Sequence, residues 1–558
     1  VSTPSCVEGS SETRSRLRYV ADDSLAKGKW QVWRVGSWLP PTPRKDGKRQ
    51  PLGRVLAASA AAFGVPLLQA ENALGGALPC AALIMHRDGA FAGSRWATFA
   101  LQPAKGDLPA PVAKAVTGAA RALATGAWIK GPHPTFRVQD GEVVMDVSLP
   151  VANPSPTDVQ MTVSLRIGDT APIARQISAP ARHAAVVDHV LAKGLPAPDL
   201  ASQALLLTVD LTKATGPVFG PRRFEVDLKK QLRVVSDFMV REARDDAKLH
   251  GYSFIDNRGM RALLGAYEIL GDRRYLRTAL RWGETMVKEQ REDGGYRMGY
   301  GITRKGEACY VADGGEIVVG VLRLASYAKG AQRQRFLDSA DRYMAYREEF
   351  RVETGGIGVG WCMQDYGKRP IPKLDKPTRI YSPENNTYTI GCTLAGAYAH
   401  AFVHGTPELE RRAEKDADWL IPRAPRLNGA FIESYMFAHA FATTPERKKL
   451  YADYIDRVFT QVMVDSYSTF EWWLSGGGRT ALNLDGLAYA VHRLGAGPAV
   501  RAEMYRALCA MYSPQSPRSI PTVISSPVSD HDPWIYINFG TLGLVDVLKP
   551  IVSIDGWK

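Results

Sequence analysis

The links between helices in the C-terminal part of the chain alternate between short and long. Helical periodicity continues from about residue 229 to the end. Short links such as GDRRY (271–275) and TTPE (443–446) alternate with long links that are rich in aromatic and polar residues, such as 293–315 and 513–536. This alternation predicts six helix hairpins arranged in a ring. The twelve expected helices are 229–245, 257–271, 273–290, 314–328, 331–350, 387–404, 407–421, 430–443, 445–464, 479–494, 498–511 and 537–548.

The helices that follow the long links differ in composition from the others. They are rich in small residues and poor in charge, as in GCTLAGAYAHAF and ALNLDGLAYAV, whereas PERKKLYADYIDRVF is typical of the charged set. A helix that is covered on all sides needs an apolar surface all round, so we expect the first set inside the ring and the second outside. Six long loops then meet at the N-terminal ends of the inner helices, where free backbone N–H groups and helix dipoles suit anionic groups. We call this edge the rim and expect the active site there.

The helical part resembles the (α/α)6-toroid carbohydrate-active enzymes. The segment GMRALLGAYEILGDRRYLRTALRWGETMVKEQREDGGY (259–296) is similar to their hairpin repeat, in which a Gly-Asp link joins two helices and an Asp-Gly-Gly turn follows. The resemblance covers residues 229–558 and implies a glycoside hydrolase or a polysaccharide lyase. Within this group the chain is loosely similar to unsaturated glucuronyl hydrolase-like enzymes, in which two aspartates enter successive early inner helices. Asp256 and Asp313 occupy such places.

The residues before the helical part predict an antiparallel β-sandwich of Ig-like type. The segments FRV, EVVMDVSLPV, VQMTVSLRI, HAAVVDHVL and ALLLTVDL alternate between apolar and polar residues and are separated by Asp-Gly and Asn-Pro turns. The Ala-, Pro- and Gly-rich stretch before them predicts a strand at WATFALQ and a helix at PVAKAVTGAARAL. We therefore expect an upstream segment over 1–70, a sandwich with an irregular N-terminal part over 71–228, and an (α/α)6 toroid over 229–558.

The first seventy residues have the composition of a targeting region. A basic stretch at 44–54 precedes the apolar VLAASAAAFGVPLLQA at 55–70, which has small residues near its end. This order is typical of a secretory signal peptide, and a buried Ala-rich helix is the alternative. The signal-peptide interpretation predicts a secreted or periplasmic enzyme whose true start lies inside the printed sequence.

Composition narrows the classes of partner and cofactor. With 45% hydrophobic and 23% charged residues the chain is typical of globular proteins, and it has no run of 18 apolar residues that would span a membrane. The six cysteines form no CxxC pair and no zinc spacing with histidine, so we expect no metal and no cofactor. The net charge of +13 is spread along the chain, which argues against nucleic acid and favours an acidic polysaccharide or oligosaccharide, or a membrane surface. Heavy use of Arg in a GC-rich genome explains the charge equally well.

Hydrolysis of a glycosidic bond needs two carboxyl groups, one that protonates the leaving oxygen and one that acts as base or nucleophile. We favour Asp313 because two glycines follow it and would let a substrate approach closely, with Glu316 one turn on. Asp256 and Glu433 are the other catalytic candidates. An Asp at a helix start is also a common N-cap, which is the structural alternative for Asp256 and Asp313. The carboxylates expected at the rim are Asp256, Asp313, Glu316, Glu384, Glu433, Glu471, Asp485, Asp530 and Asp532.

The substrate-binding candidates are aromatic side chains that stack on sugar rings and polar or cationic ones that hold acidic groups. They are Arg258, Tyr296, Trp361, Asn386, Tyr388, Trp472, Trp473, Arg479, His531 and Trp534. β-Elimination on a uronic acid is a second possible reaction, with Tyr388, Asn386, Arg479 and His531 as its groups. A non-catalytic glycan-binding protein, in which the sandwich is the binding module, is a third function.

Overall fold

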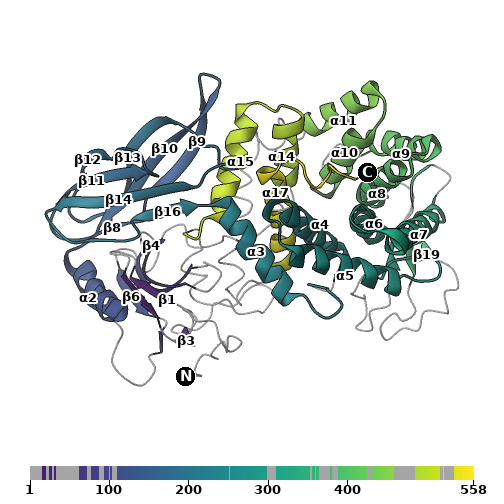
Figure 1. Cartoon of the computed structure of the whole chain (residues 1–558). Coiled ribbons are helices and arrows are strands. Elements are labelled where there is room, and N and C mark those ends of the chain that lie inside the picture. Colours follow the sequence, from purple (N-terminus) through teal and green to yellow (C-terminus); the bar gives the residue numbers. More distant parts are fainter. Residues whose placement is uncertain are drawn as a thin grey trace. The chain divides into compact units, whose positions relative to one another are not determined.

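The computed structural model divides the chain into two compact units. Unit 1 comprises Val1–Asp227 and Leu508–Ser529 and holds most of the β-strands, and unit 2 comprises Leu228–Ala507 and Asp530–Lys558 and holds most of the helices (Figure 1). A sheet-containing N-terminal region is therefore followed by a helical C-terminal part. The structure describes residues 16–19, 24–27, 31–32, 62–71, 77–86, 94–99, 101–102, 110–249, 252–297, 309–351, 355–357, 360–362, 378–379, 387–423, 429–457, 484–515, 520 and 533–557.

An antiparallel five-stranded sheet begins unit 1. Its order is β2 (Ser24–Lys27), β1 (Arg16–Tyr19), β4 (Ala62–Glu71), β5 (Ala77–His86) and β6 (Arg95–Phe99), and a short pair joins β3 (Gln31–Val32) to β7 (Leu101–Gln102). Helix α2 (Ala110–Thr125) contacts β1, β4 and β6, and its buried alanines share a core with Leu68 and Leu83. The expected strand at WATFALQ and helix at PVAKAVTGAARAL are thus present. The apolar segment that we interpreted as a signal peptide contributes β4.

Two further sheets of unit 1 contact each other through β12. One has the order β13 (His183–Pro196), β10 (Glu142–Asn153), β8 (Ala127–Ile129) and β15 (Val218–Phe219), with β9 (His133–Gln139) also on β10; the other has the order β12 (Ile173–Ala179), β11 (Val159–Ile167), β14 (Leu205–Ala214) and β16 (Arg223–Val226). Along β11 the residues Val159, Met161, Val163 and Leu165 are buried in alternation, as a period of two dictates. All five expected strands are present, whereas β8, β12, β15 and β16 were not expected.

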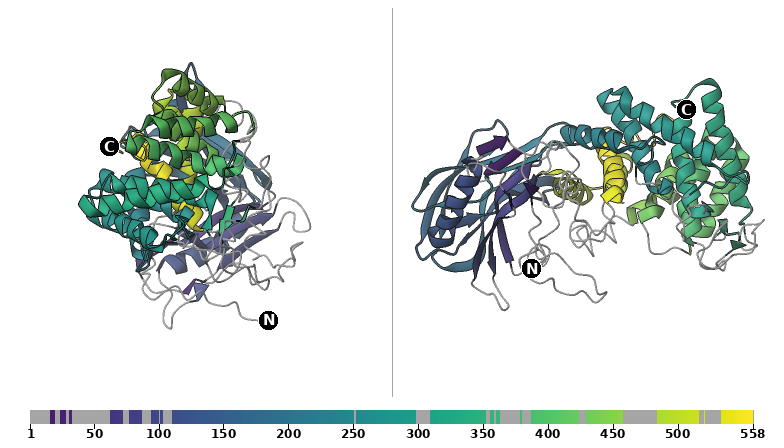
Figure 2. Two further views of the ribbon diagram at one scale, coloured as in Figure 1. Left: turned by 90° about the vertical axis from the view of Figure 1, so that its right-hand side faces the viewer. Right: turned by 90° about the horizontal axis from the view of Figure 1, so that it is seen from below.

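Six helices of unit 2 form a closed cycle of contacts. They are α4 (Ser253–Leu270), α6 (Val311–Ala325), α8 (Thr387–His404), α10 (Gly429–Phe441), α14 (Leu484–Arg493) and α17 (Pro533–Leu548). Each contacts the next, and α17 contacts α4 (Figures 1 and 2). These are the helices that follow the long links in the sequence, and we call them the inner helices.

The remaining expected helices also have counterparts. Helices α5 (Arg273–Glu289), α7 (Gly330–Glu348), α9 (Pro407–Leu420) and α11 (Pro445–Arg457) contact α4, α6, α8 and α10 respectively, and α3 (Leu228–Glu242) contacts α4 and α17. Helix α15 (Pro498–Tyr512) follows α14, and β17 (Cys309–Tyr310), β18 (Gly360–Cys362) and β19 (Thr378–Arg379) form a small sheet. Among the described residues no helix is long and apolar enough to cross a membrane.

Glycines let the inner helices approach one another closely. A Cβ atom added to Gly315 on α6 would lie 2.6 Å from Cα of Thr393 on α8, and one added to Gly396 would lie 2.5 Å from Cγ1 of Val318. A Cβ atom on Gly314 would collide with the ring of Tyr343 on α7. The two glycines after Asp313, which we expected to admit substrate, are therefore needed for helix packing. This corrects the reason for which the sequence favoured Asp313.

Candidate active site

Five charged side chains from four inner helices meet in unit 2 and are almost fully buried. Arg258 and Arg261 come from α4, Glu316 from α6, Glu433 from α10 and Asp485 from α14. All except Arg261 lie within the first two turns of their helices, towards the ends that were expected to form the rim. Charged residues are rarely buried unless they are paired, so these side chains must compensate one another. We call this group the carboxylate cluster.

Arg258 connects the three carboxylates of the cluster. Its Nη2 atom lies 2.7 Å from Oε2 of Glu316 and 2.5 Å from Oε2 of Glu433, and its Nη1 atom lies 3.9 Å from Oδ2 of Asp485. Arg261 forms an ion pair with the other oxygen of Glu433. The Arg258 guanidinium also lies 4.2 Å from the ring centroid of Phe539 on α17, a cation–π distance. One side chain thus links α4 to four other inner helices.

Burial and pairing shift the pKa values of these carboxyl groups in opposite directions. Burial raises the pKa of Glu316 to about 7, although Arg258 opposes the change. Burial, reinforced by the charge of Glu433, raises the pKa of Asp485 to about 6. Burial also opposes ionisation of Glu433, but the charges of Arg258 and Arg261 outweigh it and lower the pKa of Glu433. Near neutral pH the cluster therefore holds a partly protonated carboxyl group, Glu316, beside the ionised Glu433. A carboxyl group whose pKa lies near 7 can act as a general acid at that pH.

Neither of the two favoured aspartates is an N-cap. The N-cap positions of α4 and α6 are Tyr252 and Tyr310, whereas Asp256 and Asp313 lie inside the first turn. Asp256 is fully buried, and its Oδ2 accepts a hydrogen bond of 3.2 Å from the backbone N–H of Leu249, which fixes the chain just before α4. That contact is structural.

Asp313 lies on the same helix as Glu316. It precedes Glu316 by three positions on α6, so the two carboxyl groups lie on the same face of the helix, one turn apart. Asp313 is 5% exposed, about as much as Glu316 at 7%. Asp313 and Glu316 are therefore similarly buried neighbours on one helix.

Two of the expected substrate-binding residues have other roles in the structure. Tyr296 is 1% exposed, its hydroxyl lies 2.8 Å from Oγ of Ser339, and its ring stacks on Tyr343 at 5.4 Å between centroids. It is a core side chain and not a platform for sugar. Arg258, which we expected to hold an acidic substrate, holds carboxylates of the protein itself.

The side chains of the other substrate-binding candidates are not described. Asn386, Trp472, Trp473, Arg479 and His531 are not described at all. The backbones of Trp361, Tyr388 and Trp534 belong to β18, α8 and α17, but their side chains are not described. The rim carboxylates Glu384, Glu471, Asp530 and Asp532 also lie outside the described ranges.

Sequence reasoning missed Arg261 and did not assign a role to Asp485. Both side chains lie on helices whose other residues are largely apolar, LLGAYEIL after Arg261 and GLAYAV after Asp485. A charge on an inner helix must find a buried partner, and that rule would have pointed to the cluster.

Comparison with known proteins gives weak likenesses. No model of a protein family matches the sequence, and no curated protein matches it. The chain is similar in structure to a cellobiose 2-epimerase from Bacillus thermoamylovorans, with 12% identity, 57% of this chain and 98% of that chain covered, and a TM-score of 0.39. It is also similar to a metagenome-derived glycoside hydrolase family 9 endoglucanase (13% identity, 65% and 79% covered, TM-score 0.38) and to a β-1,2-glucanase from Parabacteroides distasonis (9% identity, 98% and 84% covered, TM-score 0.31).

All three neighbours are carbohydrate-active enzymes by name. At TM-scores below 0.5 they decide neither the fold nor the activity of this chain. The proposal below therefore rests on the chain's own residues.

Proposed function

We propose that the chain is a carbohydrate-active enzyme, specifically a glycoside hydrolase that cleaves an acidic oligo- or polysaccharide with the carboxyl groups of unit 2. The observation that carries this proposal is the contact of Glu316 and Glu433 with the same Nη2 atom of Arg258, which places the negative charge of Glu433 beside Glu316 and helps to keep Glu316 protonated. Carboxyl groups whose pKa values are strongly shifted by burial and charged neighbours are concentrated at functional sites.

We further propose that unit 2 is an (α/α)6 toroid and that the two contacting sheets of unit 1 are an Ig-like β-sandwich. The closed cycle of six inner helices, four of which contact the outer helix that follows them, supports the toroid. The alternating burial along β11 supports the sandwich. In such a toroid the inner helices start at one edge, and that edge is where Asp313 and Glu316 would meet a substrate.

In this mechanism Glu316 is the proton donor for the leaving oxygen. It stays protonated up to about pH 7, partly because the negative charge of Glu433 disfavours its ionisation. Glu433 also hydrogen-bonds to Glu316, so the two groups touch and cannot stand on either side of a sugar. Glu433 is therefore a positioning residue that keeps the proton on Glu316. Asp313, one turn nearer the helix start, is the second carboxylate of the reaction and acts as base or nucleophile.

An acidic substrate fits the charge of the chain. Its net charge of +13 creates a field that attracts polyanions and repels polycations. Export, which the basic and apolar stretches at 44–70 suggest, would bring the enzyme to extracellular polysaccharides.

The proposal is tested by Glu316→Gln and Asp313→Asn in the full chain, assayed on uronate-containing and neutral polysaccharides. We expect the wild type to release reducing ends, and each variant to lose at least about 100-fold in rate, the lower end of what a positioned acid or base contributes. Asp338→Asn, which removes an exposed carboxylate on α7, is the matched control and keeps full activity. Circular dichroism verifies that all variants are folded.

Three outcomes would overturn parts of the proposal. Ultraviolet absorbance from a new conjugated double bond would identify elimination, so the enzyme would be a lyase. Binding of the polysaccharide without any product would identify a glycan-binding protein. Full activity in both variants would show that the catalytic residues do not lie on α6.

The pH dependence separates a positioning role of Glu433 from a merely structural one. The rate should fall above about pH 7, as Glu316 loses its proton. In Glu433→Gln the anion that holds this proton is gone, so the fall should begin at lower pH. If the rate of Glu433→Gln fell at the same pH as the rate of the wild type, the role given to Glu433 would be contradicted.

A further inference from the structure

Two histidines and an aspartate converge between α7 and α8, in a part of unit 2 that the proposed mechanism does not use. His400 and His404 are one turn apart on α8 and lie on the same face, and Asp341 comes from α7. The Nε2 atoms of His400 and His404 lie 2.6 and 2.9 Å from the same oxygen, Oδ1 of Asp341. The two imidazole centroids are 4.5 Å apart.

This arrangement has the donor set of a transition-metal site. The three ligand atoms lie within 4.8 Å of one another. Zn²⁺ binds imidazole nitrogen and carboxylate oxygen at about 2.0–2.2 Å in a tetrahedron, which places ligand atoms about 3.3 Å apart. The two contacts with Asp341, now 2.6 and 2.9 Å, would open by less than about 1 Å, and the two histidine nitrogens, which lie within 4.8 Å of each other, would close by up to about 1.5 Å. The Asp341 side chain, at 47% exposed, has room to move. Two histidines four residues apart on a helix are a known zinc-binding pattern.

Two Nε2 atoms that face one carboxylate oxygen can both donate hydrogen bonds without a metal, because a neutral imidazole can carry its proton on Nε2. With a bound cation, both nitrogens and the oxygen would instead donate lone pairs to the same ion. Three ligands that already converge are pre-arranged for a metal in a way that a single His–Asp hydrogen bond is not.

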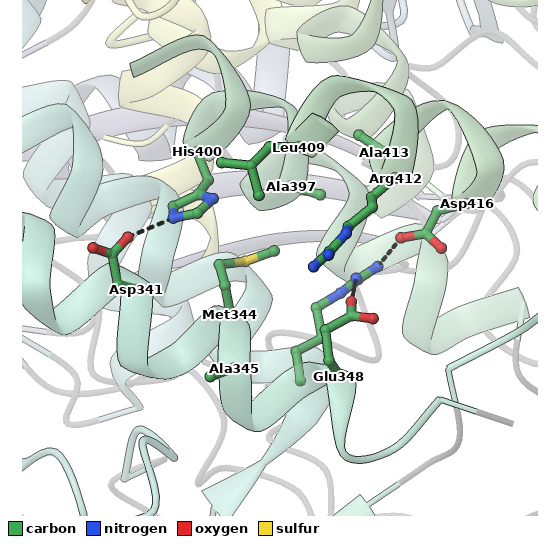
Figure 3. Close-up of a pocket in the computed structure, with 11 residues that line it drawn as sticks. Asp341, Met344, Ala345, Glu348, Ala397, His400, Leu409, Arg412, Ala413 and Asp416 are labelled. Atoms are coloured by element: carbon green, nitrogen blue, oxygen red, sulfur yellow. Dashed lines mark hydrogen bonds and ion pairs between the residues drawn. The ribbon is translucent and has the colours of Figure 1, made fainter. Parts of the chain in front are cut away.

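A pocket of about 210 Å³ opens beside these residues. Its wall is formed by α7, α8 and α9, and Asp341 and His400 face each other at one side of it (Figure 3). Three protein ligands leave the fourth position of a tetrahedral ion open. Asp341 and His400 line this pocket and His404 does not, so a ligand in the pocket would approach the ion from the side of Asp341 and His400.

We propose that Asp341, His400 and His404 form a binding site for one Zn²⁺ ion. The ion would join α7 to inner helix α8 and would leave one coordination position for an exogenous ligand. We expected no metal from the sequence because we considered the spacing of cysteines. The signal that this approach missed is the pair of histidines in HAFVH.

Zinc titration of the untagged full chain after treatment with a chelator tests the proposal. We expect one equivalent of Zn²⁺ to bind by calorimetry, and Co²⁺ in its place to give the visible absorption of a tetrahedral site. Loss of a residue that only hydrogen-bonds to a metal ligand costs about 10–100-fold in metal affinity, so His404→Ala and Asp341→Asn, which remove ligands, should each weaken binding by at least about 10-fold. Zinc should also raise the unfolding temperature of the wild type and not that of His404→Ala.

Matched controls make the result specific. His492→Ala removes an exposed histidine from α14, and Asp338→Asn removes an exposed carboxylate one turn before Asp341; both should bind Zn²⁺ as the wild type does. Absence of saturable binding would overturn the site. Binding that survives both His404→Ala and Asp341→Asn would also overturn it, because the ion would then be held by other residues.

Discussion

Replacing Arg258 by Met tests whether the carboxylate cluster holds the inner helices together. Met keeps an apolar stem of similar length beside Phe539 but removes the guanidinium. That group makes two short contacts with carboxylates, 2.7 Å to Glu316 and 2.5 Å to Glu433. Hydrogen bonds to charged groups contribute about 1.5–3 kcal/mol each, so the pair contributes about 3–6 kcal/mol. Removing one partner of a buried ion pair costs about 3–5 kcal/mol of folding free energy, which agrees with the sum for the two contacts.

The cost should depend on pH in a defined direction. Without Arg258, the pKa of Glu433 rises, because burial is no longer opposed by two arginines. Near pH 5 the carboxyl groups of the variant can take up protons and become neutral, whereas near pH 7.5 at least one stays ionised and poorly compensated. We therefore expect a loss of about 3–5 kcal/mol near pH 7.5 and a clearly smaller loss near pH 5.

Urea unfolding followed by far-ultraviolet circular dichroism measures this loss, because unit 2 contributes most of the helical signal. Arg274→Met is the matched control: Arg274 pairs with Asp272 and Asp237, but its side chain is 51% exposed. Exposed ion pairs contribute about 0–1 kcal/mol, so this control should change little at either pH. A loss below about 1 kcal/mol in Arg258→Met, or an equal loss at both pH values, would refute the reasoning.

Three further predictions concern other parts of the chain. Gly396→Ala should destabilise unit 2 by about 1–3 kcal/mol through its contact with Val318, despite the better helix propensity of Ala, whereas Gly497→Ala, with nothing within 4 Å, should be nearly neutral in the same unfolding assay. Burial raises the pKa of Asp546 to about 7, so the folded chain binds a proton that the unfolded chain releases near pH 4, and stability falls as pH rises between these values. Asp546→Asn should therefore be more stable than the wild type near pH 8, by about 2–4 kcal/mol, and equal stability would contradict this. Cleavage near residue 70 on export stays a prediction, checked by the mass of the secreted protein. A mature chain that retains Ala62–Glu71, the residues of β4, would contradict it.

Periodicity allowed most elements to be predicted, because a buried face leaves a repeat in the sequence. The alternation in β11 and the small-residue pattern of α8 are examples, and both elements were expected at nearly their observed bounds. Strand β4 was not predicted, because an apolar run rich in Ala, preceded by basic residues, has the same composition as a signal peptide. Local composition does not distinguish a strand that pairs with β1 and β5 from a segment that is removed.

The candidate site was harder to predict, because its members are far apart in sequence. Arg258 and Glu316 are 58 positions apart, and Arg261 and Glu433 are 172 positions apart, so only the closure of the helix cycle brings them together. Sequence reasoning placed the active site at the rim and named Asp313, Asp256 and Glu433, which lie near the starts of inner helices, but it could not show which of these side chains meet. The zinc ligands show the same limit: His400 and His404 are visible as a pair in the sequence, but Asp341 joins them only through the packing of α7 on α8.

Unit 1 contains residues 508–529, which the ribosome makes after nearly all of unit 2. Gln515 from this segment accepts a hydrogen bond of 2.9 Å from the backbone N–H of Glu225, 290 positions earlier. During synthesis, the hydrogen bond between Glu225 and Gln515 can therefore form only after most of unit 2 has been made. A gene cut after codon 227 would yield an incomplete sheet unit, and a frameshift before codon 508 would damage both units at once. Unit 1 is formed by two segments that are separated in the sequence by most of unit 2, so moving unit 1 into another protein requires both residues 1–227 and residues 508–529.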